Sequence, residues 1–136
     1  MANWAFEEVE HTADWALRVR GRDLDELLGN AAWGMIHMMG LEAGTDLATA
    51  RRVRLEAPDA ESLLVAWLEE LLYGIELRGV AYSEIEVHTQ GGTCLTATVK
   101  EQPAVAIQRY IKAVTYHGLQ IEESPEGLTA RVVFDV

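Results

Sequence analysis

Three short stretches hold the side chains of this sequence that could do chemistry. The first, His11-Thr12-Ala13-Asp14, places an imidazole, a hydroxyl and a carboxylate between two strand-like segments. The second, KAVTYHG at 112–118, contains one of the two lysines of the chain and ends in Tyr116-His117-Gly118. The third is the final pair, Asp135-Val136, where a side-chain carboxylate stands beside the terminal carboxylate.

The carboxylates at Asp14, Asp135 and Val136 could hold a divalent cation. The last segment is apolar and alternating to its end, so we expect Val136 to be tied down rather than frayed. Hard anionic oxygens suit Ca²⁺ or Mg²⁺, which prefer oxygen ligands at roughly 2.0–2.6 Å. Spacing alone does not bring Asp14 to the other end of the chain. An ordinary polar turn and a solvated Asp135 remain the alternative interpretation.

Other chemistries find little support in the sequence. It contains no GxGxxG, GxxxxGK, HExxH or GxSxG motif, and the single Cys94 stands in a strand-like segment where a packed thiol is usual. Twenty-two acidic residues oppose eleven basic ones, a formal net charge of −11. Nucleic-acid affinity comes largely from Lys and Arg that neutralise phosphates, so direct, tight nucleic-acid binding is not expected.

The first half of the chain predicts strand, turn, strand and helix. Residues 15–20 alternate with period two, which is typical of a half-buried strand. Asp23 is a good N-cap for a helix over 24–39, with Gly40 at its end. A short strand is expected around 51–57. A second helix follows over 60–77, whose two leucine-rich rows form a wide apolar stripe.

The second half predicts mostly strands. Two alternating segments flank Gly91-Gly92 in the pattern of a β-hairpin, and the segment 128–136 alternates to the end of the chain. We therefore expect a single α+β domain over 1–136, in which two amphipathic helices pack on mostly antiparallel β-sheet. No apolar run approaches the ~20 residues that cross a bilayer. The N-terminus lacks a basic signal-peptide region, so a cytoplasmic protein without membrane association is expected.

Four segments together resemble the archease family: HTAD at 11–14, LLVAWLEELLY at 63–73, KAVTYHG at 112–118 and VVFDV at 132–136. They occur in the family's order and span nearly the whole chain. KAVTYHG and the final Asp-Val are the most specific of them, whereas the helical segment mainly reflects core packing. The resemblance implies the archease fold.

The resemblance also implies a function. Archeases are protein cofactors, not enzymes, of the catalytic subunit of the tRNA-splicing RNA ligase; they promote guanylylation of the ligase and multiple turnover in RNA end joining. The family is further associated with a divalent ion, assigned as calcium. Carried onto this sequence, the ion ligands are Asp14, Asp135 and Val136, and the residues of partner activation are Lys112, Asp14 and Asp135. His11 and His117 could orient these carboxylates through hydrogen bonds, or could be structural.

Two other functions are compatible with the same residues. A stand-alone metal-dependent phosphoesterase would share the carboxylates, although a second set of metal ligands and a general base are not evident. A chaperone-like protein-binding module would need an exposed apolar patch of several hundred Å². The stripe on the second helix could provide that patch only if the sheet leaves it uncovered.

Overall fold

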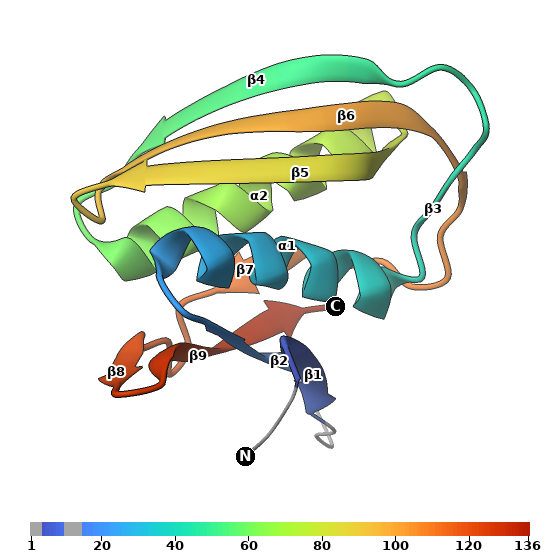
Figure 1. Cartoon of the computed structure of the whole chain (residues 1–136). Coiled ribbons are helices and arrows are strands. Elements are labelled where there is room, and N and C mark those ends of the chain that lie inside the picture. Colours follow the sequence, from blue (N-terminus) through green and yellow to red (C-terminus); the bar gives the residue numbers. More distant parts are fainter. Residues whose placement is uncertain (1–3, 10–14) are drawn as a thin grey trace.

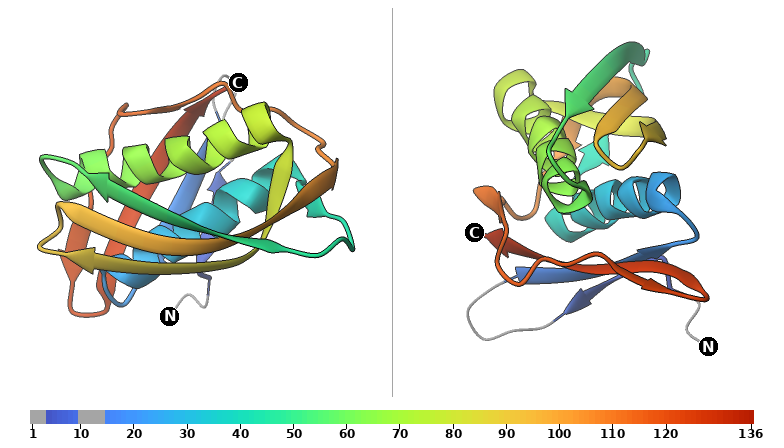
Figure 2. Two further views of the ribbon diagram at one scale, coloured as in Figure 1. Left: turned by 90° about the horizontal axis from the view of Figure 1, so that it is seen from above. Right: turned by 90° about the vertical axis from the view of Figure 1, so that its left-hand side faces the viewer.

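Two antiparallel β-sheets lie on opposite sides of a pair of helices in the computed structural model, which describes residues 4–9 and 15–136 (Figure 1). The predicted α+β class is confirmed. The two further views show the layers: helices α1 and α2 lie between a lower sheet, which contains both ends of the described chain, and an upper sheet built from its middle (Figure 2). The apolar core fills the space between the sheets, around both helices.

The lower sheet joins the start of the chain to its end. Its strand order is β1-β2-β9-β7, with β8 also paired to β9. All of these pairings are antiparallel. The strands are β1 (Phe6–Val9), β2 (Trp15–Gly21), β7 (Ala113–Thr115), β8 (Glu122–Ser124) and β9 (Gly127–Asp135). Leu17 and Val132 pair across β2 and β9 and are both fully buried against the helices, as the alternation predicts.

The upper sheet is built around the long strand β6. The predicted hairpin is present, since β5 and β6 pair along their lengths on either side of Gly91-Gly92. Strand β4 pairs with the other edge of β6, and the two-residue β3 pairs with its far end. The strands are β3 (Glu42–Ala43), β4 (Thr49–Glu56), β5 (Val80–Gln90) and β6 (Cys94–Ala106).

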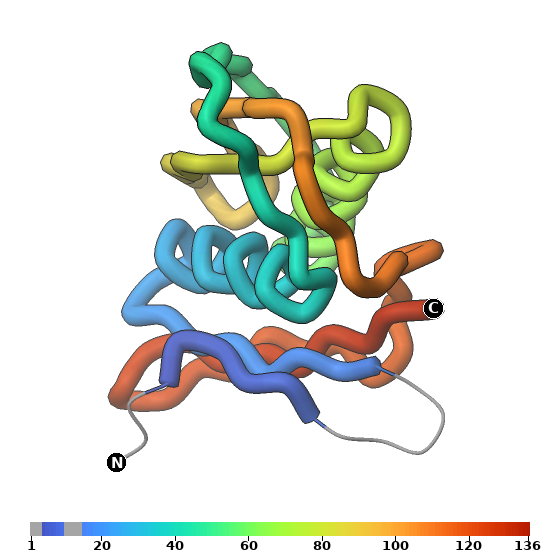
Figure 3. Tube along the Cα trace, turned by 90° about the vertical axis from the view of Figure 1, so that its right-hand side faces the viewer, coloured from blue at the N-terminus to red at the C-terminus, as the bar shows by residue number. Residues whose placement is uncertain are grey.

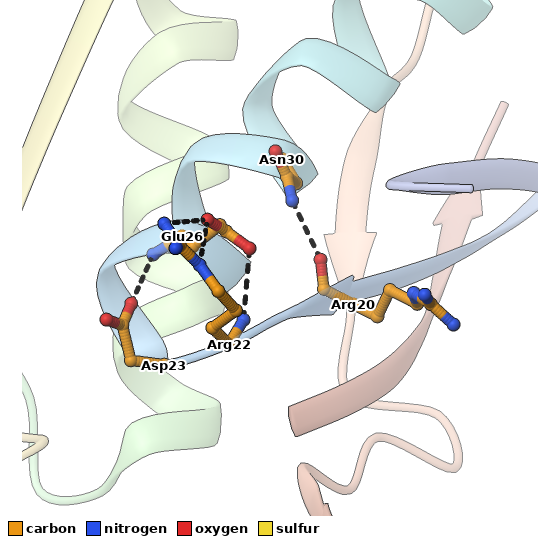
Figure 4. Close-up of polar contacts among 5 residues, drawn as sticks. All are labelled: Arg20, Arg22, Asp23, Glu26 and Asn30. Carbon is orange, nitrogen blue, oxygen red and sulfur yellow. Dashed lines mark hydrogen bonds and ion pairs between the residues drawn. The ribbon is translucent and has the colours of Figure 1, made fainter. Parts of the chain in front are cut away.

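Helix α1 (Leu24–Met39) begins and ends where the sequence predicts. The Asp23 carboxylate accepts a hydrogen bond from the Glu26 N–H at 2.9 Å, which satisfies one of the free amides of the first turn. Glu26 in turn accepts from the backbone N–H of Arg22 at 3.1 Å (Figure 4). Gly40 ends the helix in the left-handed conformation, at φ 60°. Asn30 ties the helix to β2 by donating to the Arg20 carbonyl at 2.8 Å.

Helix α2 (Ala60–Arg78) has its wide apolar stripe covered. Asp59 caps its start, and the hydrogen bond from the Ser62 N–H lowers the pKa of the Asp59 carboxyl. Trp67 Nε1 donates to the Leu28 carbonyl of α1 at 2.9 Å, which pairs the only polar atom of that buried ring. The stripe faces the core and offers no exposed apolar patch of the kind a chaperone-like module would need. The residues of its two rows, all buried, are Leu63, Leu64, Trp67, Leu68, Leu71, Leu72 and Ile75.

Neither α1 nor α2, the helices of the described chain, is long and apolar enough to cross a membrane.

Candidate functional site

The start of β2 and the end of β9 lie side by side. Trp15, the first described residue after 10–14, pairs with Phe134, the residue before Asp135. This register joins positions more than one hundred residues apart in the sequence. His11 and Asp14 lie outside the described residues, so their predicted roles stay predictions.

The segment with Lys112 joins the same corner from the other side of β9. The Lys112 N–H donates to the Asp135 carbonyl at 2.7 Å, and Ala113 pairs with Asp135 in the β7–β9 ladder. Asp135 is exposed, and Val136 is 42% exposed. The tube view shows the C-terminal end, the start of β2 and the segment before β7 at one end of the molecule (Figure 3).

Lys112 shares a hollow with residues of α2, three of which are glutamates. It lines a hollow of about 290 Å³ whose other walls come from that helix. No described carboxylate lies within ion-pair distance of its ammonium group. The helix residues around it are Ala66, Glu69, Glu70, Leu72, Tyr73 and Glu76.

Two of the α2 glutamates hold the segment that carries Lys112. Glu69 Oε1 accepts a hydrogen bond from the Val114 N–H at 3.1 Å, on the edge of β7 that has no strand partner. Glu61 Oε2 accepts in the same way from the Ile121 N–H at 3.0 Å. The first bond satisfies an amide that the edge strand β7 would otherwise leave open, and the second satisfies the amide just before β8. Sequence reasoning missed both residues, because a glutamate on a helix gives no local sign that it will bind a distant backbone amide.

His117 lies at the other end of β7. Ala113 pairs with Asp135 and Thr115 pairs with Val133, so β7 runs away from the C-terminal residue as it approaches His117. The His117 N–H donates to Thr115 Oγ1 at 3.3 Å in an exposed turn. The structure therefore brings Lys112 to Asp135 but leaves His117 apart from that pair.

The donor groups that the structure describes at this corner are hard oxygens. Asp135 offers a carboxylate at the exposed end of β9, beside Val136, and such oxygens fit Ca²⁺ or Mg²⁺ rather than a soft metal. Within residues 4–9 and 15–136 there is no group of three or more His, Cys, Asp or Glu side chains arranged to hold a metal ion. Asp14, the third residue of the predicted ligand set, lies outside that part of the chain.

Comparison with known proteins places this architecture in a family. The model of the Archease protein family matches residues 6–136. The chain belongs to the archease family. A protein archease from Methanosarcina barkeri is 34% identical over 139 residues, which cover 96% of this chain and 95% of that archease. A protein archease from Thermococcus kodakarensis is 32% identical over 138 residues and covers 93% of each chain.

Solved archease structures have the same fold. A solution structure of a protein from Methanobacterium thermoautotrophicum superposes with a TM-score of 0.69 at 28% identity, over 97% of this chain and 99% of that one. A crystal structure from Thermotoga maritima, named an archease and "possible chaperone", superposes with a TM-score of 0.71 at 24% identity, over 96% of each chain. The two sheets with helices between them are therefore the archease fold.

Proposed function

We propose that this archease activates the catalytic subunit of the tRNA-splicing RNA ligase. In this proposal it promotes guanylylation of the ligase and so permits multiple turnover in RNA end joining. It acts as a protein cofactor in the cytoplasm and not as an enzyme in its own right. The ligase holds the RNA, and the archease presents the corner that carries Lys112 and Asp135 to the ligase, with Asp14 as the third residue that we propose takes part.

The observation that carries the proposal is the convergence of separate motifs at this corner. Strand β9 is the meeting point: Trp15 pairs with Phe134 on one side, and the Lys112 N–H binds the Asp135 carbonyl on the other. The two backbones meet at this corner, where the Asp135 side chain is exposed and Lys112, which has no ion-pair partner among the described residues, lines the hollow against α2. A partner surface that handles a triphosphate could use both groups.

A divalent cation, calcium or magnesium, is part of the proposal. Asp135 and Asp14 would hold it through their carboxylates, with Val136 as a further oxygen ligand. When bound, the ion would supply positive charge near the phosphate groups that the ligase activates. Lys112 would add a second positive charge from the opposite side of β9, as a compact donor that suits phosphate oxygens. The remaining residues of the corner hold these groups in place.

Single-turnover and multiple-turnover ligation assays test the activator role. The assay combines the RNA ligase of the same organism, GTP, Mn²⁺ or Mg²⁺, and RNA halves with a 2′,3′-cyclic phosphate end. We expect the wild-type archease to raise the number of ligations per ligase molecule, and Asp135→Asn, Asp14→Asn and Lys112→Ala to abolish that increase. Asp46→Asn, an exposed aspartate in the β3–β4 connection, is the matched control and should activate normally. An unchanged turnover number with wild-type protein would refute the function.

Cation binding is tested without the ligase. Calcium should raise the unfolding temperature of the wild-type archease, because an ion that binds only the folded state stabilises it by about 2.7 kcal/mol at one hundred times its Kd. The same titration should leave Asp135→Asn unchanged and should still stabilise Asp46→Asn. A residue appended after Val136 displaces the carboxylate there, and an unaltered calcium shift in that variant would remove Val136 from the ligand set.

A further inference from the structure

Three arginines gather on the outer face of the lower sheet, the face turned away from α1. We call Arg18, Arg20 and Arg131, together with Trp4, the arginine face. Arg18 and Arg20 alternate with the buried Leu17 and Val19 along β2, so their side chains leave the sheet on its outer side. The helices cover only the inner side of this sheet (Figure 2).

This clustering works against the stability of the sheet. Arg18 and Arg131 are directly opposite partners across β2 and β9, and like charges in that position are destabilising. Glu7 neutralises Arg18, at 3.1 Å between Nη1 and Oε1. No carboxylate among the described residues lies within ion-pair distance of Arg20 or Arg131. In a chain with twice as many acidic as basic residues, an uncompensated local excess of arginine indicates binding of an anion.

Trp4 adds an aromatic surface to this charge. The Arg18 and Arg20 guanidinium carbons lie 5.1 and 5.2 Å from the centre of the Trp4 ring, within range of a cation–π interaction. Trp4 also lines two hollows, one of about 250 Å³ with Arg20 and one of about 270 Å³ with Arg18 and Arg131. The close-up shows the Arg20 side chain extended along β2, away from the polar contacts at the start of α1 (Figure 4).

The arginine face lies on the same sheet surface as the end of β9. Alternation along this strand places Arg131 and Asp135 on the same side, since Val132 and Phe134 point into the core. Four residues of antiparallel strand span about 13 to 14 Å. A chain of phosphates bound at Arg131 therefore lies within a few nucleotides of the corner that contains Asp135.

We propose that the arginine face binds a segment of single-stranded RNA. Arginines that follow the phosphates and an aromatic ring on which bases stack are the two elements of sequence-independent single-strand binding. The choice of RNA rests on the proposed function, because the RNA ends are the other component of that reaction. The net charge of −11 keeps the affinity low, which suits a strand that the ligase already holds. Glu26 and Glu126, which line the first hollow, and Glu122, which lines the second, weaken the attraction for phosphate further.

RNA is a better occupant than an acidic protein segment because of Trp4. A glutamate-rich peptide would use the arginines alone, whereas a nucleotide uses the arginines and the ring between the two hollows. Each hollow adjoins both kinds of group. Removing the ring should thus weaken RNA binding and leave the attraction for an acidic peptide intact.

The test measures fluorescence anisotropy of a labelled single-stranded RNA at low salt, with archease alone. We expect Arg20→Ala/Arg131→Ala and Trp4→Ala each to weaken binding at least tenfold. The matched control is Arg52→Ala/Arg54→Ala, which removes two arginines from the outer face of the upper sheet beside a hollow of about 490 Å³. That variant should bind within twofold of the wild type. The slope of log affinity against log salt should fall by about 1.4 when two phosphate contacts are lost.

Three outcomes would overturn the proposal. The first is that the wild type does not bind RNA at low salt. The second is that the two double-arginine variants lose equal affinity for RNA. The third is that the wild type binds a poly-glutamate peptide as tightly as RNA and that Trp4→Ala does not change the affinity for the peptide. The last result would assign the face to an acidic protein segment. Folding is checked by urea unfolding, where Arg131→Ala should be as stable as the wild type or more so, because it removes a like-charge pair. No ligase is present, so failure of this proposal is separate from failure of the activator function.

Discussion

Gly74 and Tyr82 form a contact that makes a double-mutant cycle informative. The Tyr82 hydroxyl donates to the Leu71 carbonyl at 2.7 Å, and the side chain is 4% exposed. Burial, followed by the nearby Glu101 carboxylate, raises the pKa of the Tyr82 phenol well above its usual value, so the hydroxyl stays a donor at any working pH. A Cβ atom at Gly74 would collide with that hydroxyl oxygen.

The size of each effect follows from this geometry. Gly74→Ala gains about 1 kcal/mol of helix propensity but loses about 2 kcal/mol to overpacking against the hydroxyl, so a net destabilisation of about 1 kcal/mol is expected. Tyr82→Phe loses one buried hydrogen bond and should cost about 1 kcal/mol. In the double variant the colliding atom is gone, so the propensity gain offsets the lost hydrogen bond and the stability should be close to wild type.

The expected interaction energy between the two sites is therefore about 2 kcal/mol, within the range for residues in contact. Urea unfolding of the four proteins, followed by circular dichroism, measures it. Arg78 Nη2 would lie 2.6 Å from the new Cβ, but this side chain is 31% exposed and can move aside. Additive effects, or a double variant less stable than both single variants, would refute the reasoning and place the strain elsewhere in α2.

Three further predictions concern the caps and edges of the fold. Asp23→Ala removes the N-cap of α1 and should lower the free energy of unfolding by about 1 kcal/mol, measured in urea. The pKa of Asp59 is lowered in the folded state by the Ser62 N–H, so its contribution is present above the unfolded pKa and is lost as pH falls through the folded pKa. Unfolding curves at pH 5 and pH 2.5 should show this loss in the wild type but not in Asp59→Asn, which caps without titrating. Glu69→Ala should speed hydrogen exchange of the Val114 amide, seen by NMR, and Glu69→Gln should restore its protection.

The helices and the hairpin could be predicted because their signals are local. Asp23 and Gly40 mark the two ends of α1 through capping chemistry that involves only adjacent turns. The turn at Gly91-Gly92 is equally local, since both residues adopt positive φ. Strand β6 also continues through Pro103, although proline is uncommon inside a strand. Its missing N–H does not interrupt the ladder there, and its carbonyl accepts from the Gly44 N–H at 3.1 Å.

The periodicity of the sequence does not predict how the two sheets are arranged around the helices. The wide stripe of α2 shows that the helix is buried over much of its surface, but not that the cover comes from one sheet above and another below. The candidate site could not be predicted from local patterns either. Lys112 and Asp135 are 23 positions apart, and only the β7–β9 pairing joins them. The family resemblance grouped these two residues in one site, whereas their spacing in the sequence gave no sign that they lie close together.

The pairing of β2 with β9 also sets an order of events during protein synthesis. Strand β2 ends at Gly21, but its neighbour β9 is made only after more than one hundred further residues. Until then the apolar side of β2 and the adjoining side of α1 have no finished layer to rest on, and contacts between such distant positions form slowly. The nascent chain is therefore vulnerable to aggregation until β9 has been made, and loss of β9 would leave β2 with β1 as its only neighbour in the lower sheet.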